Sequence, residues 1–218
     1  MELIVYTAVI GKTDPLHDPD VGGARFVCFT DQAIKSKRWE IVKLDKQEAP
    51  TRTARTLKLN PHHLFPEADA SLWIDACFTL KHDLESLLAR YPQEVVNFRH
   101  RDRTRIVDEA HQIAKLGKAR PMPTFKQLAT YQSEGFDTVD NPMKELSCNG
   151  ALMRRHTDKV ARFNELWTRQ IEEHTLRDQM SADYAAWRTG ITFGRWEGTH
   201  DACPHFGHKY FQRPVNDF

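Results

Sequence analysis

The distribution of apolar positions along the chain predicts alternating strands and helices. An apolar run over residues 3–10 ends at a glycine, which indicates a buried strand. Shorter apolar or alternating runs predict further strands at residues 25–31, 39–44, 72–75, 94–98 and 146–153. Helical spacing predicts helices at residues 51–65, 83–91, 106–116, 124–131, 158–171 and 178–187, with Pro61 interrupting the first. Strands that alternate with helices predict an α/β layered fold with a mostly parallel central sheet.

The end of the chain has no such periodicity. Residues 199–218 contain His200, His205 and His208 together with two prolines and one glycine. We therefore expect residues 199–218 to form a C-terminal tail that folds over a site. No repeat, low-complexity tract or linker divides the chain, so we predict one domain over residues 1–218.

Composition narrows the classes of function. The chain has 40% hydrophobic residues and a net charge of +1, so it is globular and has no electrostatic feature that favours nucleic acid. No apolar run approaches the roughly 20 residues of a membrane span. The start of the chain lacks the basic region of a signal peptide, and its four cysteines are scattered. These features predict a cytoplasmic protein with reduced thiols.

The first candidate site residue is Asp75, which lies between two apolar runs. A carboxylate in this position is costly to bury unless a partner is present. It could simply cap a helix or turn after the strand. Alternatively, it lies at the carboxyl edge of a parallel sheet, where α/β proteins bind ligands, and holds a divalent cation.

Three basic residues precede that strand. Arg52, Arg55 and Lys58 share one helical face, which is typical of a solvated surface or of a phosphate clamp. A second charged segment, residues 97–103, leaves a strand and is followed by Glu109. It either forms exposed ion pairs or the wall of a pocket for a hydroxyl-rich or anionic substrate.

A third segment, Arg177-Asp-Gln-Met-Ser181, begins a predicted helix, where Asp178 could serve only as a cap. The tail histidines suggest a metal, but their spacing is not that of a zinc site. The chain contains no glycine-rich nucleotide loop, nucleophile elbow or HExxH motif.

Taken in order, these motifs resemble those of a known family. The relevant segments are Tyr6–Gly11, Phe29-Thr-Asp31, Arg55-Thr-Leu-Lys58, Trp73-Ile-Asp75, His100-x-x-Arg103 with Glu109-Ala110, Asn149-Gly150, Arg177-Asp-Gln-x-Ser181 and His205-Phe-Gly…Lys209. The chain resembles the glycosyltransferase-like family catalogued as domain of unknown function 616. That family is related to the family 8 nucleotide-sugar glycosyltransferases. The resemblance implies a GT-A-like, Rossmann-like three-layer fold.

The resemblance also implies an activity, a donor and an acceptor. It implies transfer of a sugar from a nucleotide diphosphate-sugar to the hydroxyl of a glycan, lipid-linked or protein acceptor. The implied roles are a donor pocket and its diphosphate contacts (Tyr6, Thr7, Ala8, Asp31, Arg55, Lys58, His100, Arg103 and Lys209), a metal or ribose contact (Asp75 with His205), and sugar and acceptor contacts (Asn149, Asp178 and Gln179). Glu109 is the next candidate for catalysis if Asp178 proves to be only a cap.

One departure bears on the cofactor. Family 8 usually has Asp-x-Asp, whereas this chain has Cys77 in the second position, and a thiol is a poor ligand for Mg²⁺. Weak Mn²⁺ binding and metal-independent transfer, with Arg55 and Lys58 neutralising the diphosphate, both remain open. Two rival functions also remain: a non-catalytic nucleotide- or carbohydrate-binding module on this fold, and a histidine-dependent metal hydrolase.

Overall fold

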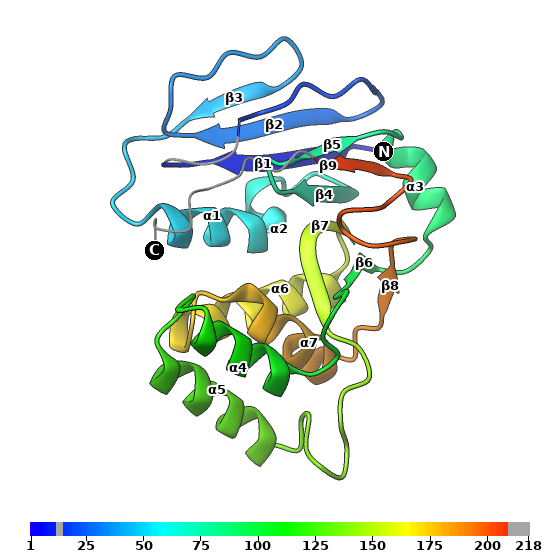
Figure 1. Cartoon of the computed structure of the whole chain (residues 1–218). Coiled ribbons are helices and arrows are strands. Elements are labelled where there is room, and N and C mark those ends of the chain that lie inside the picture. The colour runs from blue at the N-terminus through cyan, green and yellow to red at the C-terminus, as the bar shows by residue number, and fades with distance from the viewer. Residues whose placement is uncertain (12–14, 209–218) are drawn as a thin grey trace.

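A computed structural model describes residues 1–11 and 15–208 (Figure 1). The strands are β1 (Leu3–Val9), β2 (Arg25–Thr30), β3 (Glu40–Lys43), β4 (Ala70–Ile74), β5 (Phe78–Leu80), β6 (Val95–Arg99), β7 (Ser147–Arg155), β8 (Phe193–Arg195) and β9 (Phe206–His208). The helices are α1 (Pro50–Leu59), α2 (Pro61–Leu64), α3 (Leu84–Arg90), α4 (Ile106–Lys115), α5 (Pro121–Ser133), α6 (Asp158–Glu173) and α7 (Asp178–Thr189).

The central sheet has seven strands in the order β3-β2-β1-β4-β7-β6-β8. Neighbouring strands run parallel from β3 to β4 and between β6 and β8, while β7 is antiparallel to both of its neighbours. This mixed, mostly parallel sheet flanked by helices confirms the predicted α/β class and is consistent with a Rossmann-like GT-A fold. The predicted interruption at Pro61 is also confirmed, since this residue begins α2.

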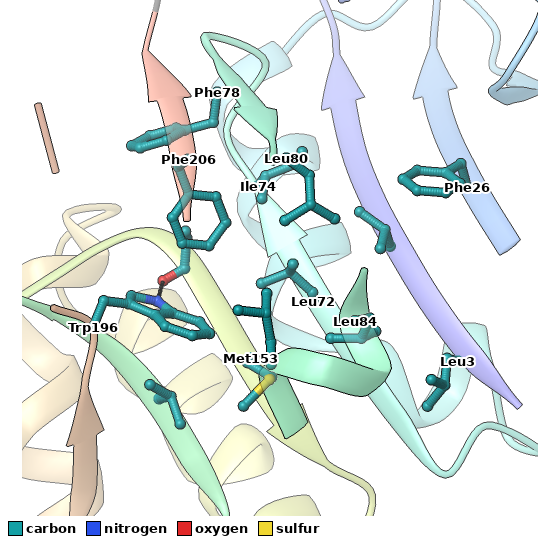
Figure 2. Close-up of a cluster of buried hydrophobic side chains, with 14 of the residues drawn as sticks. Leu3, Phe26, Leu72, Ile74, Phe78, Leu80, Leu84, Met153, Trp196 and Phe206 are labelled. Atoms are coloured by element: carbon teal, nitrogen blue, oxygen red, sulfur yellow. Dashed lines mark hydrogen bonds between the residues drawn. The ribbon is translucent and has the colours of Figure 1, made fainter. Parts of the chain in front are cut away.

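Alternating side chains of the sheet supply a hydrophobic core on each face. One core joins the sheet to α3, β5 and β9, and Figure 2 shows its side chains converging between β4, β7 and the tail strand. The other core packs the opposite face against α1, α2, α6 and α7. A third core lies among α4, α5 and α7, which form the lower part of the molecule in Figure 1.

The prediction that the tail is a loop was wrong for residues 206–208. These residues form β9, which pairs antiparallel with β5 in a separate two-stranded sheet. The physical reason is burial: Phe206 packs against Phe78 and Trp196 in the first core (Figure 2). Sequence periodicity also missed β5 and β8, because each has only three residues. Residues 209–218, the end of the predicted tail, lie outside the described residues.

A stacked pair of histidines joins α2 to the end of β7. The rings of His62 and His156 lie 4.2 Å apart with an interplanar angle of 17°. His62 also contacts the Asn164 amide, and His156 contacts the Ser71 hydroxyl. Burial and the nearby Arg154 charge lower the pKa of His62 to about 4, and burial, the partner ring and Arg154 lower that of His156 to about 3.

The histidine pair predicts acid sensitivity. A folded-state pKa below the ordinary 6.5 means that the folded protein favours neutral rings. The stabilisation is therefore complete above pH 6.5 and is lost as the pH falls towards 4. We expect the melting temperature to fall over this range, and to fall less steeply in His156→Gln. The exposed His111 is the control, and His111→Gln should retain the wild-type slope. Parallel wild-type and His156→Gln curves would contradict the prediction.

Candidate functional site

Asp75 lies directly after β4, at the carboxyl edge of the sheet. Its backbone N–H donates to the carbonyl of Gly150, which ties it to β7. The indole Nε1 of Trp73 donates to Asp75 Oδ1 at 2.7 Å. The side chain remains 41% exposed, so the carboxylate is fixed by its neighbours yet accessible from outside. This is the position that the sequence predicted for a ligand-binding acid.

A buried lysine connects Asp75 to the second predicted acid. Lys58 Nζ lies 2.7 Å from Asp178 Oδ2 and 3.8 Å from Asp75 Oδ1. Arg55, one turn earlier on α1, places Nη2 3.4 Å from Asp178 Oδ1. Four predicted site residues, separated by up to 123 positions, therefore form one cluster, whereas Arg52 is exposed. We call Arg55, Lys58, Asp75 and Asp178 the acid–base cluster.

Asp178 is not a helix cap, so that alternative is wrong. The cap position of α7 is Arg177 and has no side-chain capping bond, while the Asp178 carboxylate accepts from Lys58. Burial alone would raise the pKa of Asp178. The charges of Arg55, Lys58 and Arg177 and the Lys58 hydrogen bond outweigh burial and hold this pKa below its usual range. The residue is therefore a buried, ionised carboxylate that joins α7 to α1.

A second buried cation supports the backbone of Lys58. Arg154 Nη2 donates to the Lys58 carbonyl at 2.7 Å, and its Nη1 donates to Asn164. Tyr6 also donates its hydroxyl to the Lys58 carbonyl at 2.7 Å and contacts Arg154. Sequence reasoning missed Arg154, which follows directly after the apolar residues Ala151-Leu-Met153 and, when buried at such a position, needs a polar partner.

The structure corrects the role predicted for the Tyr6 side chain. Its ring is fully buried and packs edge-on against Phe65 and Trp73, so it cannot line a nucleotide pocket. Burial raises the pKa of Tyr6 to about 12, despite the nearby Arg154 charge. Tyr6 therefore positions the helix that carries Lys58.

The other residues predicted for the nucleotide lie along the same edge. Thr7 is fully buried in β1, and Ala8 is half-buried. Asp31 follows β2 and accepts the backbone N–H groups of Gly11 and Gln47, which fixes the loops after β1 and β3. The Gly11 hydrogen bond lowers the pKa of Asp31 and, together with that from Gln47, outweighs the opposing effect of burial.

Asn149 and Gly150 complete the site from β7. Asn97 Nδ2 donates to Asn149 Oδ1 at 2.9 Å, which orients the Asn149 amide. A Cβ at Gly150 would lie 2.8 Å from a Phe78 ring carbon and 3.4 Å from Asp75 Oδ2. Glycine at position 150 therefore leaves the space that lets Asp75 and Phe78 lie close to β7.

Several buried hydrogen-bond donors around the cluster have no partner among the described residues. They are Thr7 Oγ1, Arg55 Nε, Asn149 Nδ2, Arg177 Nε, Gln179 Nε2 and Ser181 Oγ. Each unsatisfied buried donor costs about 1–3 kcal/mol. A ligand rich in hydroxyl or phosphate oxygens, or ordered water, would satisfy them.

The predicted residues His100 and Arg103 form a compact turn after β6. His100 Nδ1 accepts the backbone N–H groups of Asp102 and Arg103 at 3.1 Å each. Arg103 Nε donates to the buried Glu109 at 2.6 Å. Burial and the Arg103 charge lower the pKa of His100 to about 4, so this ring is neutral near pH 7. The predicted contact of His100 and Arg103 with the nucleotide-sugar donor stays a prediction.

The residues predicted to hold a metal are not brought together. His205 is buried, and its Nε2 contacts the Tyr91 hydroxyl at 2.8 Å instead of Asp75. Cys77 Sγ lies 3.5 Å from Nε2 of another tail histidine, His208. Lys209 lies outside the described residues. Within residues 1–11 and 15–208, no group of three or more His, Cys, Asp and Glu side chains could hold a metal ion.

Comparison with known proteins assigns the family. Residues 1–194 match the TOD1/MUCI70 glycosyltransferase-like domain, which is most of the chain. The chain belongs to this family. Within it, the chain is 30% identical over 138 residues to a probable hexosyltransferase, MUCI70, from Arabidopsis thaliana.

The aligned segment accounts for only part of that relative. The aligned segment covers 60% of this chain but 24% of the Arabidopsis protein. The comparison thus supports membership of a glycosyltransferase family. It does not identify the sugar donor or the acceptor of this chain, and it does not assign to this chain the activity of the whole relative. No helix in the described part of the chain is long and apolar enough to cross a membrane.

Proposed function

We propose that this chain transfers a sugar from a nucleotide diphosphate-sugar to a hydroxyl acceptor, with the acid–base cluster at the centre of the site. The observation that carries the proposal is the meeting of Arg55, Lys58, Asp75 and Asp178 at the carboxyl edge of the sheet, in a glycosyltransferase-like domain. Ligands of open α/β sheets bind at that edge.

The geometry suggests different roles for the two acids. Asp75 is half-exposed, so its free oxygen can accept from a ribose or sugar hydroxyl. Asp178 is buried and holds Arg55 and Lys58 in place, so that their charge is fixed before the donor binds. Preorganised cations stabilise the negative charge that develops on a departing diphosphate. The donors of Asn149, Gln179 and Ser181 would meet hydroxyl or phosphate oxygens.

The side chains fit a divalent cation poorly. Asp75 is the carboxylate predicted to hold a metal, and its Oδ1 already accepts from Trp73 and lies 3.8 Å from Lys58 Nζ. The second position is the Cys77 thiol, a weak ligand for Mg²⁺. We therefore assign no step to a metal and propose that Arg55 and Lys58 supply the positive charge. Cytoplasmic location stays a prediction.

A second candidate is a non-catalytic nucleotide- or carbohydrate-binding module. The observation that favours it is Cys77, which occupies the position of the second acid and contacts His208. Such a module would bind a nucleotide sugar without releasing the nucleotide. Binding and turnover must therefore be measured separately.

The test uses the full chain and a panel of nucleotide sugars with their nucleoside diphosphates. We expect one of them to raise the melting temperature, with roughly 2.7 kcal/mol of stabilisation at about 100 times the dissociation constant. We also expect nucleotide release from the matching nucleotide sugar, and most of this rate to persist after chelation with EDTA.

The outcomes separate the alternatives. Binding without nucleotide release would favour the non-catalytic module. Release that stops with EDTA and returns with Mn²⁺ would contradict the metal-independent proposal. If no nucleotide or nucleotide sugar raises the melting temperature, with or without divalent ions, the donor site does not exist.

A further inference from the structure

A hollow of about 400 Å³ lies at the end of β6, outside the acid–base cluster. Its lining residues are Arg99, His100, Arg101, Arg195, Trp196, Gly198 and Thr199. Three of these residues are arginines and none is acidic. The volume is within the range of roughly 300–1,000 Å³ of small-molecule sites. The guanidinium groups of these arginines are thus the charged groups of the lining.

The acids that pair with these arginines are not part of the lining. Arg101 Nη1 lies 2.6 Å from Asp201 and its Nε lies 3.0 Å from Asp102. Glu145 contacts both Arg99 and Arg195, and Arg195 also lies 3.9 Å from Asp183. The Arg101 side chain is 52% exposed. Exposed ion pairs of this kind are worth about 0–1 kcal/mol. A ligand anion can therefore replace a partner of Arg99 or Arg101 at little cost in stability, whereas the less exposed Arg195 keeps its contacts with Glu145 and Asp183.

Hydrogen bonds connect the hollow to the candidate active site. Arg195 Nη1 donates to Asn97 Oδ1, and Asn97 Nδ2 donates to Asn149 Oδ1 at 2.9 Å. The buried Nδ2 of Asn149 has no partner among the described residues. The hollow is thus two hydrogen bonds from a residue that the proposed function places beside the sugar.

Residues of the C-terminal segment form a second connection between the hollow and the acid–base cluster. Thr199 lines the hollow, and the ring of the next residue, His200, lies 5.8 Å from that of His208. His208 in turn contacts Cys77, two residues after Asp75. The wall itself is well fixed, because Trp196 is buried in the core and donates its indole N–H to the Ala151 carbonyl (Figure 2).

We propose that this hollow binds the carboxylate of an acidic acceptor sugar. The inference rests on the proposed function, because it assigns the acceptor side of the same site. Arginine holds a carboxylate through two parallel hydrogen bonds, and Arg99, Arg101 and Arg195 are arranged around one space. The donor diphosphate has a separate set of cations, Arg55 and Lys58. The acceptor is thus a uronate-bearing saccharide.

The test measures binding of defined probes to the full chain by calorimetry. The probes are glucuronate and galacturonate oligosaccharides of matched length, with their carboxyl-reduced, neutral counterparts. A single charge-assisted contact predicts that an acidic probe binds about tenfold more tightly than its neutral counterpart. Arg101→Gln and Arg99→Gln should each remove much of this preference. Arg25→Gln is the matched control, since Arg25 is 49% exposed, pairs with Glu40 and lies on β2, away from β6 and β8 in the strand order.

Equal affinity of wild-type protein for acidic and reduced probes would overturn the inference, and this comparison needs no variant. Retention of the full preference in both Arg99→Gln and Arg101→Gln would overturn it too. Displacement of the acidic probe by inorganic phosphate at a lower concentration would show a phosphate site instead. Donor hydrolysis in the same preparation separates the two proposals: hydrolysis without the preference removes only this inference, and the preference without hydrolysis removes only the proposed function.

Discussion

Asp178→Asn is expected to lower kcat by about 100-fold, which corresponds to a barrier increase of roughly 2.7 kcal/mol. Asparagine has nearly the same shape and can still accept from Lys58, but it removes the charge that fixes Lys58 and Arg55. Breaking a buried ion pair from one side also destabilises a fold, by about 3–5 kcal/mol. We therefore expect a fall in melting temperature together with the loss of turnover.

The control must separate the loss of stability from the loss of chemistry. Asp137 provides this control. Its carboxylate is buried, as that of Asp178 is, and pairs with Arg105 at 2.7 Å near α4 and α5, away from the acid–base cluster. Asp137→Asn should lower the melting temperature but retain kcat per folded molecule. If Asp178→Asn also retained kcat per folded molecule, Asp178 would be a purely structural ion pair, and Glu109 would be the next candidate.

Asp75→Asn is expected to abolish transfer, by a factor of about 100 or more, while leaving the melting temperature nearly unchanged. The asparagine oxygen can still accept from Trp73, and the side chain is half-exposed, so little folding energy depends on its charge. A charged carboxylate holds a ribose or sugar hydroxyl more strongly than the neutral amide does. The measurements are kcat, donor affinity and melting temperature.

Asp69→Asn is the control for Asp75. Asp69 precedes the same strand, and its exposed carboxylate accepts the backbone N–H of Glu2 at the opposite edge of the sheet. This variant should retain full activity. A folded Asp75→Asn protein with wild-type turnover would remove Asp75 from the site and would shift attention to the exposed face of α1.

The buried ion pairs explain why the local predictions for Asp178 and Tyr6 were only partly right. A carboxylate at a predicted helix start is usually a cap, and nothing local shows that Lys58, 120 residues earlier, takes its charge instead. In the same way, a tyrosine in a first strand is equally compatible with a pocket wall or a core. Only the position of Arg154 and Lys58 decides that Tyr6 is buried.

The sequence by itself determined the α/β class, the edge position of Asp75 and the grouping of candidate residues, because apolar periodicity and the order of motifs are local properties. The tertiary structure decided which of those residues meet. It brought Arg55, Lys58, Asp75 and Asp178 into one cluster, placed His205 beside Tyr91, and formed β9 from residues predicted to be a loop. These outcomes depend on long-range packing and on the cost of burying charges without partners, and neither is written in any short segment.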